Sequence, residues 1–396
     1  MLPFRPVQVI LHRWCGLAIA LFLFIAGSTG ALISFDHELD ALLNPHLFAA
    51  ASAGSGERVL PGTALAAQVE AADPRVRVTY VLTAAAPGHT SLMSVEPRID
   101  PASGKPFELG FNQVALDPAT GQQQGRRQWG DISLSRENLL PFLYKLHYTL
   151  HIPPGWGIEF GVWLMGVVGV VWVLDCFIAL SLSFPNPRSW RKSFAFRWKQ
   201  GGHRLNFDLH RSGGVWVWGL LLVVAVSSVS MNLNTQLVRP LVALMSTLTP
   251  SPFDTRVPRP PEQPIEPSVS REQVLVLAQD EARRRGWTAP AGGLFYASAV
   301  GLYGVGFFEP GRDHGDVGLG NPWLYFEGKD GSFAGATVPG TGSAGDIFMQ
   351  AQFPLHSGRI IGLPGRILMS ALGAMVAMLS ATGLVIWLRK RRARVQ

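Results

Sequence analysis

The hydrophobic residues of this chain gather in four long blocks that carry almost no charge. Each block is close to the ~20 residues that an α-helix needs to cross a hydrocarbon layer of ~30 Å. The four predicted spans cover residues 14–35, 158–184, 213–231 and 367–388. A polar stretch of about a hundred residues follows the first span and another follows the third, and each is long enough for a small folded domain. The pattern therefore predicts a membrane protein with a four-helix bundle and two domains outside the membrane.

Charge then sets the expected orientation, because basic residues next to a span stay on the cytoplasmic side. The segment after the second span and the tail after the fourth are both basic. They contain Arg188, Arg191, Lys192, Arg197, Lys199, Arg204 and Arg211, and Arg389, Lys390, Arg391, Arg392 and Arg394. Both segments and the N-terminus are predicted to be cytoplasmic, and the two large domains extracytoplasmic. The net charge of +7 mostly reflects this asymmetry, so no nucleic-acid partner is expected.

The composition agrees with a chain retained in the membrane. The 396 residues are 47 % hydrophobic and 15 % charged, which is too apolar for an ordinary soluble protein. The first apolar block is longer than the core of a usual signal peptide, so we expect it to remain as a span. Cys15 and Cys176 both fall inside predicted spans, which excludes a disulfide framework for the outer domains.

The sequence contains an internal duplication. Leu11-His12-Arg13 opens the first span and Leu209-His210-Arg211 opens the third, and a glycine follows each after two further residues. Leu146-His147 precedes the second span, and Leu355-His356 precedes the fourth. Each half thus consists of a span, an outer domain, a Leu-His pair and a second span.

The outer stretches repeat more faintly, and both predict small α+β units built on hairpins. The first contains a helix at 63–72, a β-rich run at 76–83 and a turn at 117–121. The second contains a helix at 271–285, a β-rich run at 294–308 and a turn at 329–331. Ser270 and Gln273 are placed as a capping box for the second helix. The Pro-rich stretch 250–267 is predicted to be an extended linker.

These boundaries divide the chain into eight segments. They are the N-terminus and first span (1–35), the first outer domain (36–145), the Leu-His helix and second span (146–184), the basic cytoplasmic loop (185–212), the third span (213–232), the linker and second outer domain (233–355), the fourth span (356–388) and the cytoplasmic tail (389–396).

The repeated histidines are candidate haem ligands. Two parallel halves are naturally related by an axis along the membrane normal, which makes equivalent residues face one another. His12 is then expected to face His210 at the cytoplasmic end, and His147 to face His356 at the outer end. Two facing histidines supply both axial nitrogens of a haem iron. His151, one turn after His147, is an alternative to it, although its counterpart in the second half is isoleucine.

Other residues near the histidines fit the same interpretation. Arg13, Arg211 and Arg359 lie next to the ligands in the sequence and are expected to pair with haem propionates. Glycines near these positions are expected to leave room for the porphyrin; they are Gly16, Gly27, Gly30, Gly161, Gly166, Gly169, Gly213, Gly214 and Gly373.

The cofactor expected is two b-type haems. The sequence has no Cys-x-x-Cys-His motif for covalent haem attachment, and neither a Cys-x-x-Cys pair nor a His-Glu-x-x-His motif for zinc. Two imidazoles on one iron leave no open position, which suits electron transfer. Because no nucleotide-binding fold is predicted, the electron donor is expected to be a membrane quinol or a cytoplasmic reductase.

At these residues the chain resembles the PepSY-associated transmembrane family. The resemblance lies in the Leu-His-Arg motifs, in Lys145-Leu146-His147, in the basic loop that leads into Asp208-Leu209-His210-Arg211, and in Leu355-His356 before the last span. Residues 117–121 resemble the hairpin of a PepSY module.

The resemblance implies a protein of the bacterial inner (cytoplasmic) membrane with PepSY-like outer domains. The family includes ferric-siderophore reductases of the FoxB type, which bind two haems within four spans. It therefore implies an oxidoreductase that passes electrons to Fe(III) in a siderophore, so that the more weakly held Fe(II) is released.

Two other functions predict different observations. A membrane anchor or scaffold, whose outer modules bind a protein partner, predicts no haem. A transporter for iron or a siderophore needs polar groups at mid-membrane, and the spans offer few: Ser28, Thr29, Ser227, Ser228 and Asp175. Asp175 is the only acid well within a predicted span, and we expect it to bind a helix end or an arginine.

Overall fold

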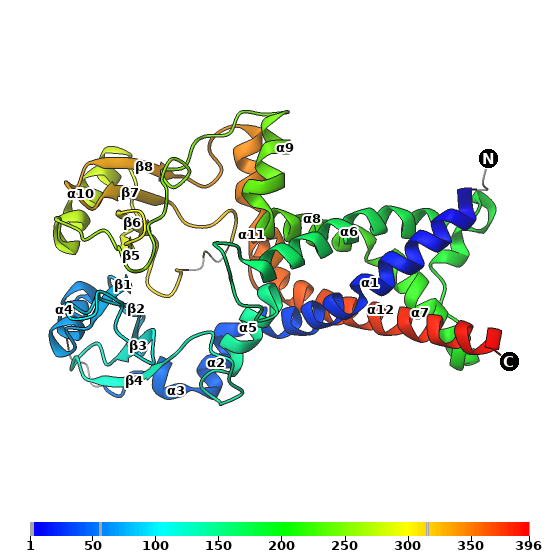
Figure 1. Cartoon of the computed structure of the whole chain (residues 1–396), viewed down its shortest axis with the longest axis horizontal. Coiled ribbons are helices and arrows are strands. Elements are labelled where there is room, and N and C mark those ends of the chain that lie inside the picture. The colour runs from blue at the N-terminus through cyan, green and yellow to red at the C-terminus, as the bar shows by residue number, and fades with distance from the viewer. Residues whose placement is uncertain (1–3, 55–57, 314, 316, 396) are drawn as a thin grey trace. The chain divides into compact units, whose positions relative to one another are not determined.

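A computed structural model describes residues 4–54, 58–313, 315 and 317–395 of the chain (Figure 1). These residues form two compact units. The helical unit contains residues up to 36, 143–247 and from 348 onward, and the sheet unit contains 37–142 and 248–347. The chain therefore passes from one unit to the other several times.

The helical unit contains three helices long and apolar enough to cross a membrane. They are α1 (Phe4–Ile33), α6 (Phe160–Ser183) and α12 (Leu363–Val395). The helix pair α7 (Gly202–Trp216) and α8 (Trp218–Asn232) makes a fourth candidate if the two count as one span. The four predicted spans fall on these helices. Among the described residues there are three candidate membrane spans, or four if the bent pair is one span.

The third predicted span, residues 213–231, is bent in the structure. The sequence did not predict this bend. The axes of α7 and α8 differ by 71°. Val217, between them, has φ −108° and ψ 9°, which is outside the helical region. Gly213 and Gly214 lie in the turn before it, and adjacent weak helix formers are a usual place for a sharp bend.

Close contact between α1 and α12 depends on two facing glycines. A Cβ atom on Gly27 would lie 2.6 Å from the carbonyl oxygen of Gly373, and one on Gly373 would lie 2.6 Å from that of Gly27. Small residues of this kind let two helix backbones approach each other. Gly161 packs equally closely on the Thr149 carbonyl, and Gly166 on the Leu233 side chain. The expectation that these four glycines leave space for a cofactor is therefore wrong.

The long helices expose apolar side chains. Leu21 is 64 % exposed on α1, and Leu174 is 60 % exposed on α6. Large apolar surfaces of this kind are avoided in water but are suited to hydrocarbon. Cys176 is buried and Cys15 partly buried, and both are free thiols.

Shorter elements complete the helical unit or link it to the sheet unit. They are α5 (Leu139–Thr149), η1 (Pro187–Ser193), η2 (Trp198–Gln200), η3 (Asn234–Val238), α9 (Arg239–Ala243), α11 (Ala344–Ser357) and η4 (Arg359–Ile361). The buried Asp208 of α7 accepts hydrogen bonds from the backbone and guanidinium of Arg197, which lies in the basic segment between α6 and α7.

The sheet unit contains one antiparallel sheet of eight strands in the order β4-β3-β2-β1-β5-β6-β7-β8 (Figure 1). The strands are β1 (Val76–Leu82), β2 (Ser91–Pro97), β3 (Gln113–Leu116), β4 (Gln123–Arg127), β5 (Ala291–Ala297), β6 (Leu302–Phe307), β7 (Trp323–Glu327) and β8 (Phe333–Thr337). The sequence predicted two outer domains, and in the structure the strands of both belong to this one sheet. If each half formed its own sheet, its first strand would be an unpaired edge. Instead, β1 pairs with β5, from Tyr80 opposite Phe295 to Leu82 opposite Gly293.

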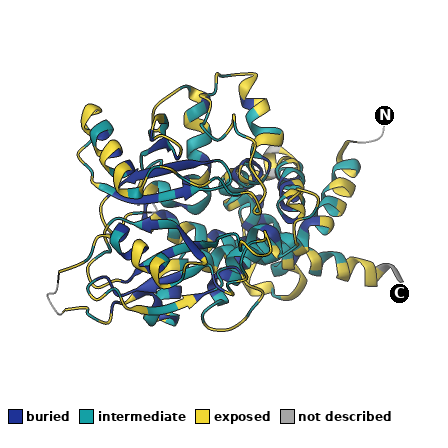
Figure 2. Cartoon of the chain, turned by 60° about the vertical axis from the view of Figure 1, so that its left-hand side comes forward, coloured by how far each residue is buried: buried dark blue, intermediate teal, exposed yellow. Residues whose placement is uncertain are grey.

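Two helices share one hydrophobic core with the strands. Leu65 and Val69 of α4 (Gly62–Ala72) and Val274 and Ala278 of α10 (Arg271–Arg284) pack with buried strand residues. Figure 2 shows this buried layer along the strands. Ser270 and Gln273 form the predicted capping box of α10. Two shorter helices, α2 (Asp36–Leu43) and α3 (Pro45–Phe48), precede the first half of the sheet.

The turns and the linker follow the sequence patterns. Asp117 accepts hydrogen bonds from the amides of Ala119 and Thr120, and Gly121 has φ +72°. Gly331 has φ +75° between β7 and β8. Residues 250–267 contain neither helix nor strand, as predicted.

Candidate functional site

The first candidate site is a pair of histidines from α1 and α7. The ring centroids of His12 and His210 lie 6.0 Å apart, and the ring planes are tilted by 45°. Each histidine belongs to the Leu-His-Arg motif of its half, so the structure brings equivalent residues of the two halves together.

A second pair comes from the helices that precede the second and fourth predicted spans. His147 near the end of α5 and His356 near the end of α11 have ring centroids 6.1 Å apart, at an angle of 64°. The spacing within this pair is almost the same as in the first.

All four imidazoles are held by their Nδ1 atoms. His12 Nδ1 lies 2.9 Å from a carboxylate oxygen of Asp175 on α6. The others contact helix carbonyls or hydroxyls: His147 contacts the Ala26 carbonyl at 3.0 Å and Thr29 at 3.1 Å, His210 the Leu379 carbonyl at 3.0 Å and Thr382 at 3.3 Å, and His356 Ser227 at 3.0 Å. Every partner thus offers an oxygen to the ring.

The hydroxyl contacts determine which ring nitrogen carries the proton. Thr29 donates its proton to the Ile25 carbonyl at 2.7 Å, and Thr382 donates to the Met378 carbonyl at 2.7 Å. Ser227 donates in the same way to a carbonyl of its own helix, at 3.1 Å. Because these protons are already used, each hydroxyl accepts a hydrogen bond from Nδ1–H. The neutral imidazole then has a free lone pair on Nε2.

The opposite nitrogen of each ring is available for binding. Within the described residues, no hydrogen bond is made by Nε2 of His12, His147, His210 or His356. An imidazole whose Nδ1–H is fixed by a carbonyl, hydroxyl or carboxylate is the usual form of a histidine that binds a metal through Nε2.

The supporting contacts repeat in the two halves. Thr29 follows His12 by the same number of residues as Ser227 follows His210. Within each half, the hydroxyl on the first helix holds the histidine that precedes the second helix. In the reverse direction, a residue near the far end of the second helix holds the first histidine: Asp175 holds His12, and Thr382 holds His210.

Two glycines allow the rings to lie against a helix. A Cβ atom on Gly383 would lie 2.9 Å from Cε1 of His210, and one on Gly30 would lie 3.0 Å from Cε1 of His147. Either side chain would push the ring away. In contrast, a Cβ on Gly16 meets nothing within 4 Å, so open space adjoins α1 close to His12.

We named Thr29 and Gly30 from the sequence without assigning them to a histidine and did not name Thr382 or Gly383, although a signal was present. Thr29-Gly30 on α1 and Thr382-Gly383 on α12 form the same dipeptide, each beside a histidine of the same half. The threonine supplies the acceptor and the glycine supplies the space.

From the sequence, we expected Asp175 to bind a helix end or an arginine. In the structure it contacts a histidine instead. It lies on α6 with its side chain 10 % exposed and holds His12. Its neighbours in the sequence, Leu174 and Cys176, carry no charge, and its carboxylate contacts the imidazole of His12.

His151 is not on the same helical face as His147, contrary to the prediction. Helix α5 ends at Thr149, and both Leu150 and His151 have φ +54°, which turns the chain away from the helical path. The structure pairs His356 with His147.

The arginines beside the first pair each contain a buried atom without a partner. Nε of Arg13 and Nε of Arg211 are buried and form no hydrogen bond within the described residues. Arg359, beside the second pair, lies 3.9 Å from Asp36. An unpaired guanidinium nitrogen is costly unless an acceptor satisfies it.

The two pairs are suited to a metal that brings other ligands with it. The described residues contain no cluster of three or more His, Cys, Asp or Glu side chains that could hold an ion. Imidazole nitrogens that lie about 2 Å from a metal on opposite sides place their ring centres about 6 Å apart, which matches both pairs. A metal held in this way has two protein ligands and needs the rest from a non-protein group.

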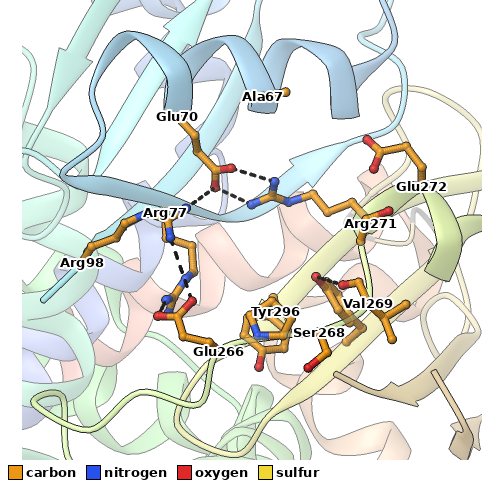
Figure 3. A pocket seen from close by; sticks show the side chains of 13 residues that line it. Ala67, Glu70, Arg77, Arg98, Glu266, Ser268, Val269, Arg271, Glu272 and Tyr296 are labelled. Carbon is orange, nitrogen blue, oxygen red and sulfur yellow. Dashed lines mark hydrogen bonds and ion pairs between the residues drawn. The ribbon is translucent and has the colours of Figure 1, made fainter. Parts of the chain in front are cut away.

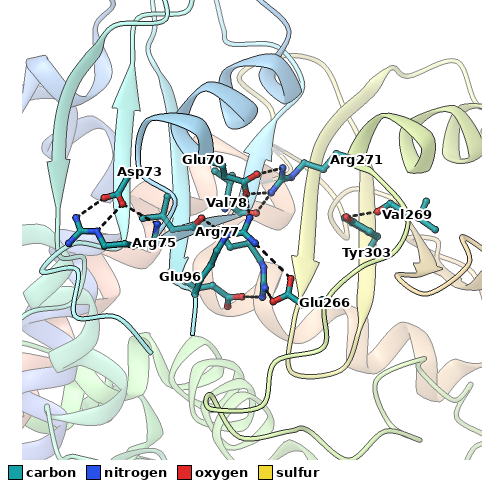
Figure 4. A network of polar contacts seen from close by, with 12 residues as sticks. Glu70, Asp73, Arg75, Arg77, Val78, Glu96, Glu266, Val269, Arg271 and Tyr303 are labelled. Carbon is teal, nitrogen blue, oxygen red and sulfur yellow. Dashed lines mark hydrogen bonds and ion pairs between the residues drawn. The ribbon is translucent and has the colours of Figure 1, made fainter. Parts of the chain in front are cut away.

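The sheet unit contains a polar cavity of about 350 Å³ between α4 and the segment that leads into α10 (Figure 3). Its charges are paired with one another. Glu70 binds Arg271 at 2.6 Å, and Arg77 lies between Glu96 and Glu266 (Figure 4). Burial alone raises the pKa of Glu70, but the hydrogen bond and charge of Arg271 reverse this and hold the pKa below its ordinary value.

The comparison with known families agrees with the resemblance at the histidine motifs. A family model described as the PepSY-associated TM region matches residues 9–390, which include both histidine pairs. A search of curated proteins found no match. Since the family model covers nearly the whole chain, this protein belongs to the family with a PepSY-associated TM region.

Proposed function

We propose that each histidine pair binds one b-type haem and that the protein transfers electrons to a ferric siderophore. The observation that supports this most strongly is the state of the four rings. Each has Nδ1 held by an oxygen. Each also has Nε2 without a partner in the described part of the chain, beside a second ring in the same state.

Three features of the site fit a haem. The ring spacing of 6.0 and 6.1 Å leaves room for one iron between two nitrogens. A porphyrin supplies the four ligands that the chain lacks. The buried Nε atoms of Arg13 and Arg211, each next to a ligand in the sequence, offer hydrogen bonds to propionates, and Arg359 has the same place beside His356.

The proposal includes a definite topology. The protein spans the bacterial inner membrane four times, through α1, α6, the bent pair α7–α8, and α12. Both termini and the basic segment between α6 and α7 are cytoplasmic, as the positive-inside rule requires. The sheet unit, with two PepSY-like halves, is periplasmic.

The chain's own residues have a limited chemical role. When bound by the two histidine pairs, the haems would supply one-electron redox chemistry. Asp175, Thr29, Thr382 and Ser227 fix the rings, so little reorganisation accompanies a change of charge. The ferric siderophore would be reduced at the outer end, near His147 and His356, by electron transfer that needs no general acid or base from the chain. The donor is a membrane quinol or a cytoplasmic reductase.

Rapid mixing of the purified full chain with a ferric chelate tests this function. Protein in detergent is reduced with one equivalent of dithionite per haem and mixed with a ferric hydroxamate under anaerobic conditions. We expect the haem bands to return to the oxidised form at a rate that rises with chelate concentration, while an Fe(II)-specific dye traps one Fe(II) per haem oxidised.

The gallium(III) chelate of the same ligand is the matched control, because it has the same shape and charge but accepts no electron. Reoxidation by both chelates, or by neither, would contradict siderophore reduction. A scaffold or transporter predicts no haem bands in the purified protein.

A further inference from the structure

The four proposed ligands are not equivalent, because only one of them is held by a carboxylate. His12 Nδ1 lies 2.9 and 3.1 Å from the two oxygens of Asp175. The other three rings contact neutral acceptors: the Ala26 and Leu379 carbonyls and the hydroxyls of Thr29, Thr382 and Ser227. The repeat is therefore symmetric in position but asymmetric in charge.

The carboxylate is also in an unusual place. Asp175 is 7 % exposed and lies in α6, a predominantly apolar helix. Its neighbours in the sequence are Leu174, Cys176 and Phe177. Acids within a span are costly and normally have a function. In the second half, His210 is held by the Leu379 carbonyl and the Thr382 hydroxyl, so neutral acceptors are sufficient to hold a ring.

A carboxylate that accepts the Nδ1 proton makes the imidazole a stronger electron donor at Nε2. Greater donation stabilises the ferric state of a bound iron relative to the ferrous state, and so lowers its reduction potential. Hydroxyls and carbonyls have a weaker effect, because they carry no full charge.

We propose that Asp175 sets the order of the two reduction potentials, so that the haem at His12 and His210 has the lower one. This rests on the proposed function. With both haems bound, an electron from the donor would pass from the haem held by His12 and His210 to the haem held by His147 and His356, and each transfer would oxidise the first by one electron and reduce the second by one. No bond is broken, and the proton stays between His12 and Asp175. The reduction potential therefore increases from the predicted cytoplasmic end to the outer end.

Spectropotentiometry of the full chain in detergent tests the order. We expect two one-electron waves in the wild-type protein. The wave that disappears in His210→Ala identifies the first pair, and the wave that disappears in His356→Ala identifies the second. The proposal is overturned if the lower wave belongs to His147 and His356.

Substitution of the acceptor tests the cause. Asp175→Thr gives His12 the same kind of neutral partner that His210 has, and Asp175→Asn keeps the shape. Both variants are expected to raise the reduction potential of the haem at the first pair alone. The difference between the two reduction potentials then becomes smaller. Thr382→Val is the matched control on the same pair: it removes a neutral acceptor, while the Leu379 carbonyl remains, so its shift is expected to be the smaller.

The outcomes separate this inference from the proposed function. Wild-type protein without haem contradicts the proposed function and the inference with it. Two haems with unchanged potentials in both Asp175 variants contradict only the inference. Loss of the haem at the first pair in both variants also overturns it, because Asp175 would then act by positioning His12. As a converse test, Ser227→Asp is expected to lower the potential of the second pair.

Discussion

Both units of the protein are built from two tandem halves, but they differ in how they treat buried polar groups. In the sheet unit, β1 and β5 join the halves, and the charged residues around the seam neutralise one another: Glu70 binds Arg271, and Arg77 binds Glu96 and Glu266. In the helical unit, the halves meet at two pairs of imidazoles whose Nε2 atoms have no partner among the residues that the structure describes.

This difference is the reason for proposing a cofactor site in the helical unit. A buried polar group without a partner is rare in folded proteins and calls for an explanation, such as an absent ligand. In the charged cavity of the sheet unit, Glu70 is paired with Arg271, and Arg77 with Glu96 and Glu266, so these groups stabilise the fold. The histidine pairs and the adjacent Arg13 and Arg211 Nε atoms leave binding capacity unused.

The largest expected effect comes from removing one ring of a pair. His210→Ala is expected to lose about half of the bound haem, because one iron loses an axial ligand while the other pair is unchanged. The measurement is pyridine haemochrome absorbance per mole of protein. His203→Ala, in the same helix but exposed, is the control. Full haem content in His210→Ala would contradict the pairing.

Filling the space beside a ring is expected to have the next largest effect. A Cβ in Gly383→Ala lies 2.9 Å from Cε1 of His210, so the ring must move and haem occupancy at the first pair falls. Gly219→Ala is the matched control in α8, since its Cβ meets nothing within 4 Å. Equal haem content in the two variants would show that Gly383 does not position the ring.

A change in the charged seam is expected to affect stability but not haem. Glu70→Gln leaves Arg271, whose side chain is 16 % exposed, without its counter-charge, which costs about 2–3 kcal/mol. Hydrogen exchange of α10 and β1 amides in the full chain reports this loss. Asp280→Asn removes an exposed pair with Arg283 and is expected to cost less than about 0.5 kcal/mol. Haem loss in Glu70→Gln would break the distinction between the units.

The smallest expected effect is a dependence on acid pH confined to the sheet unit. Burial raises the pKa of Asp117, but hydrogen bonds from Ser52, Thr120 and Ala119 outweigh it and lower the pKa to about 2 from 3.8. Because the folded pKa is below the unfolded one, the stabilisation is complete above about pH 4 and is lost as the pH falls towards 2. It amounts to on the order of 1–2 kcal/mol.

Hydrogen exchange of the β3–β4 turn at stepped pH, corrected for the intrinsic rate, measures this effect. In Asp117→Asn the acid-dependent part should disappear. An unchanged pH dependence in the variant would assign the effect to other carboxylates.

Local patterns in the sequence predicted much of the fold. The long apolar blocks located α1, α6 and α12, and the capping box located α10. The pairing of β1 with β5 was not predictable, because it joins segments far apart in the chain and depends on which edge is open. The bend at Val217 was also missed, since an apolar block has the same composition whether the helix is straight or bent.

The repeated histidine motifs predicted the candidate site, but its backbone turns and its supporting contacts could not be predicted from the sequence. The repeated Leu-His-Arg and Leu-His motifs identified four rings that the structure places in two pairs. The positive φ of Leu150 and His151, which removes His151 from the helical face, has no signature in the residue types. The acceptors Asp175 and Thr382 required knowledge of how helices far apart in sequence pack.

The haem content of the wild-type chain is the most direct test of the account. The full-length protein is expressed with ample haem supply, purified in detergent and examined by absorption in the oxidised and dithionite-reduced states, with a pyridine haemochrome assay. The account predicts low-spin b-type bands and about two haems per chain. Folded, monodisperse protein without visible absorption would contradict it.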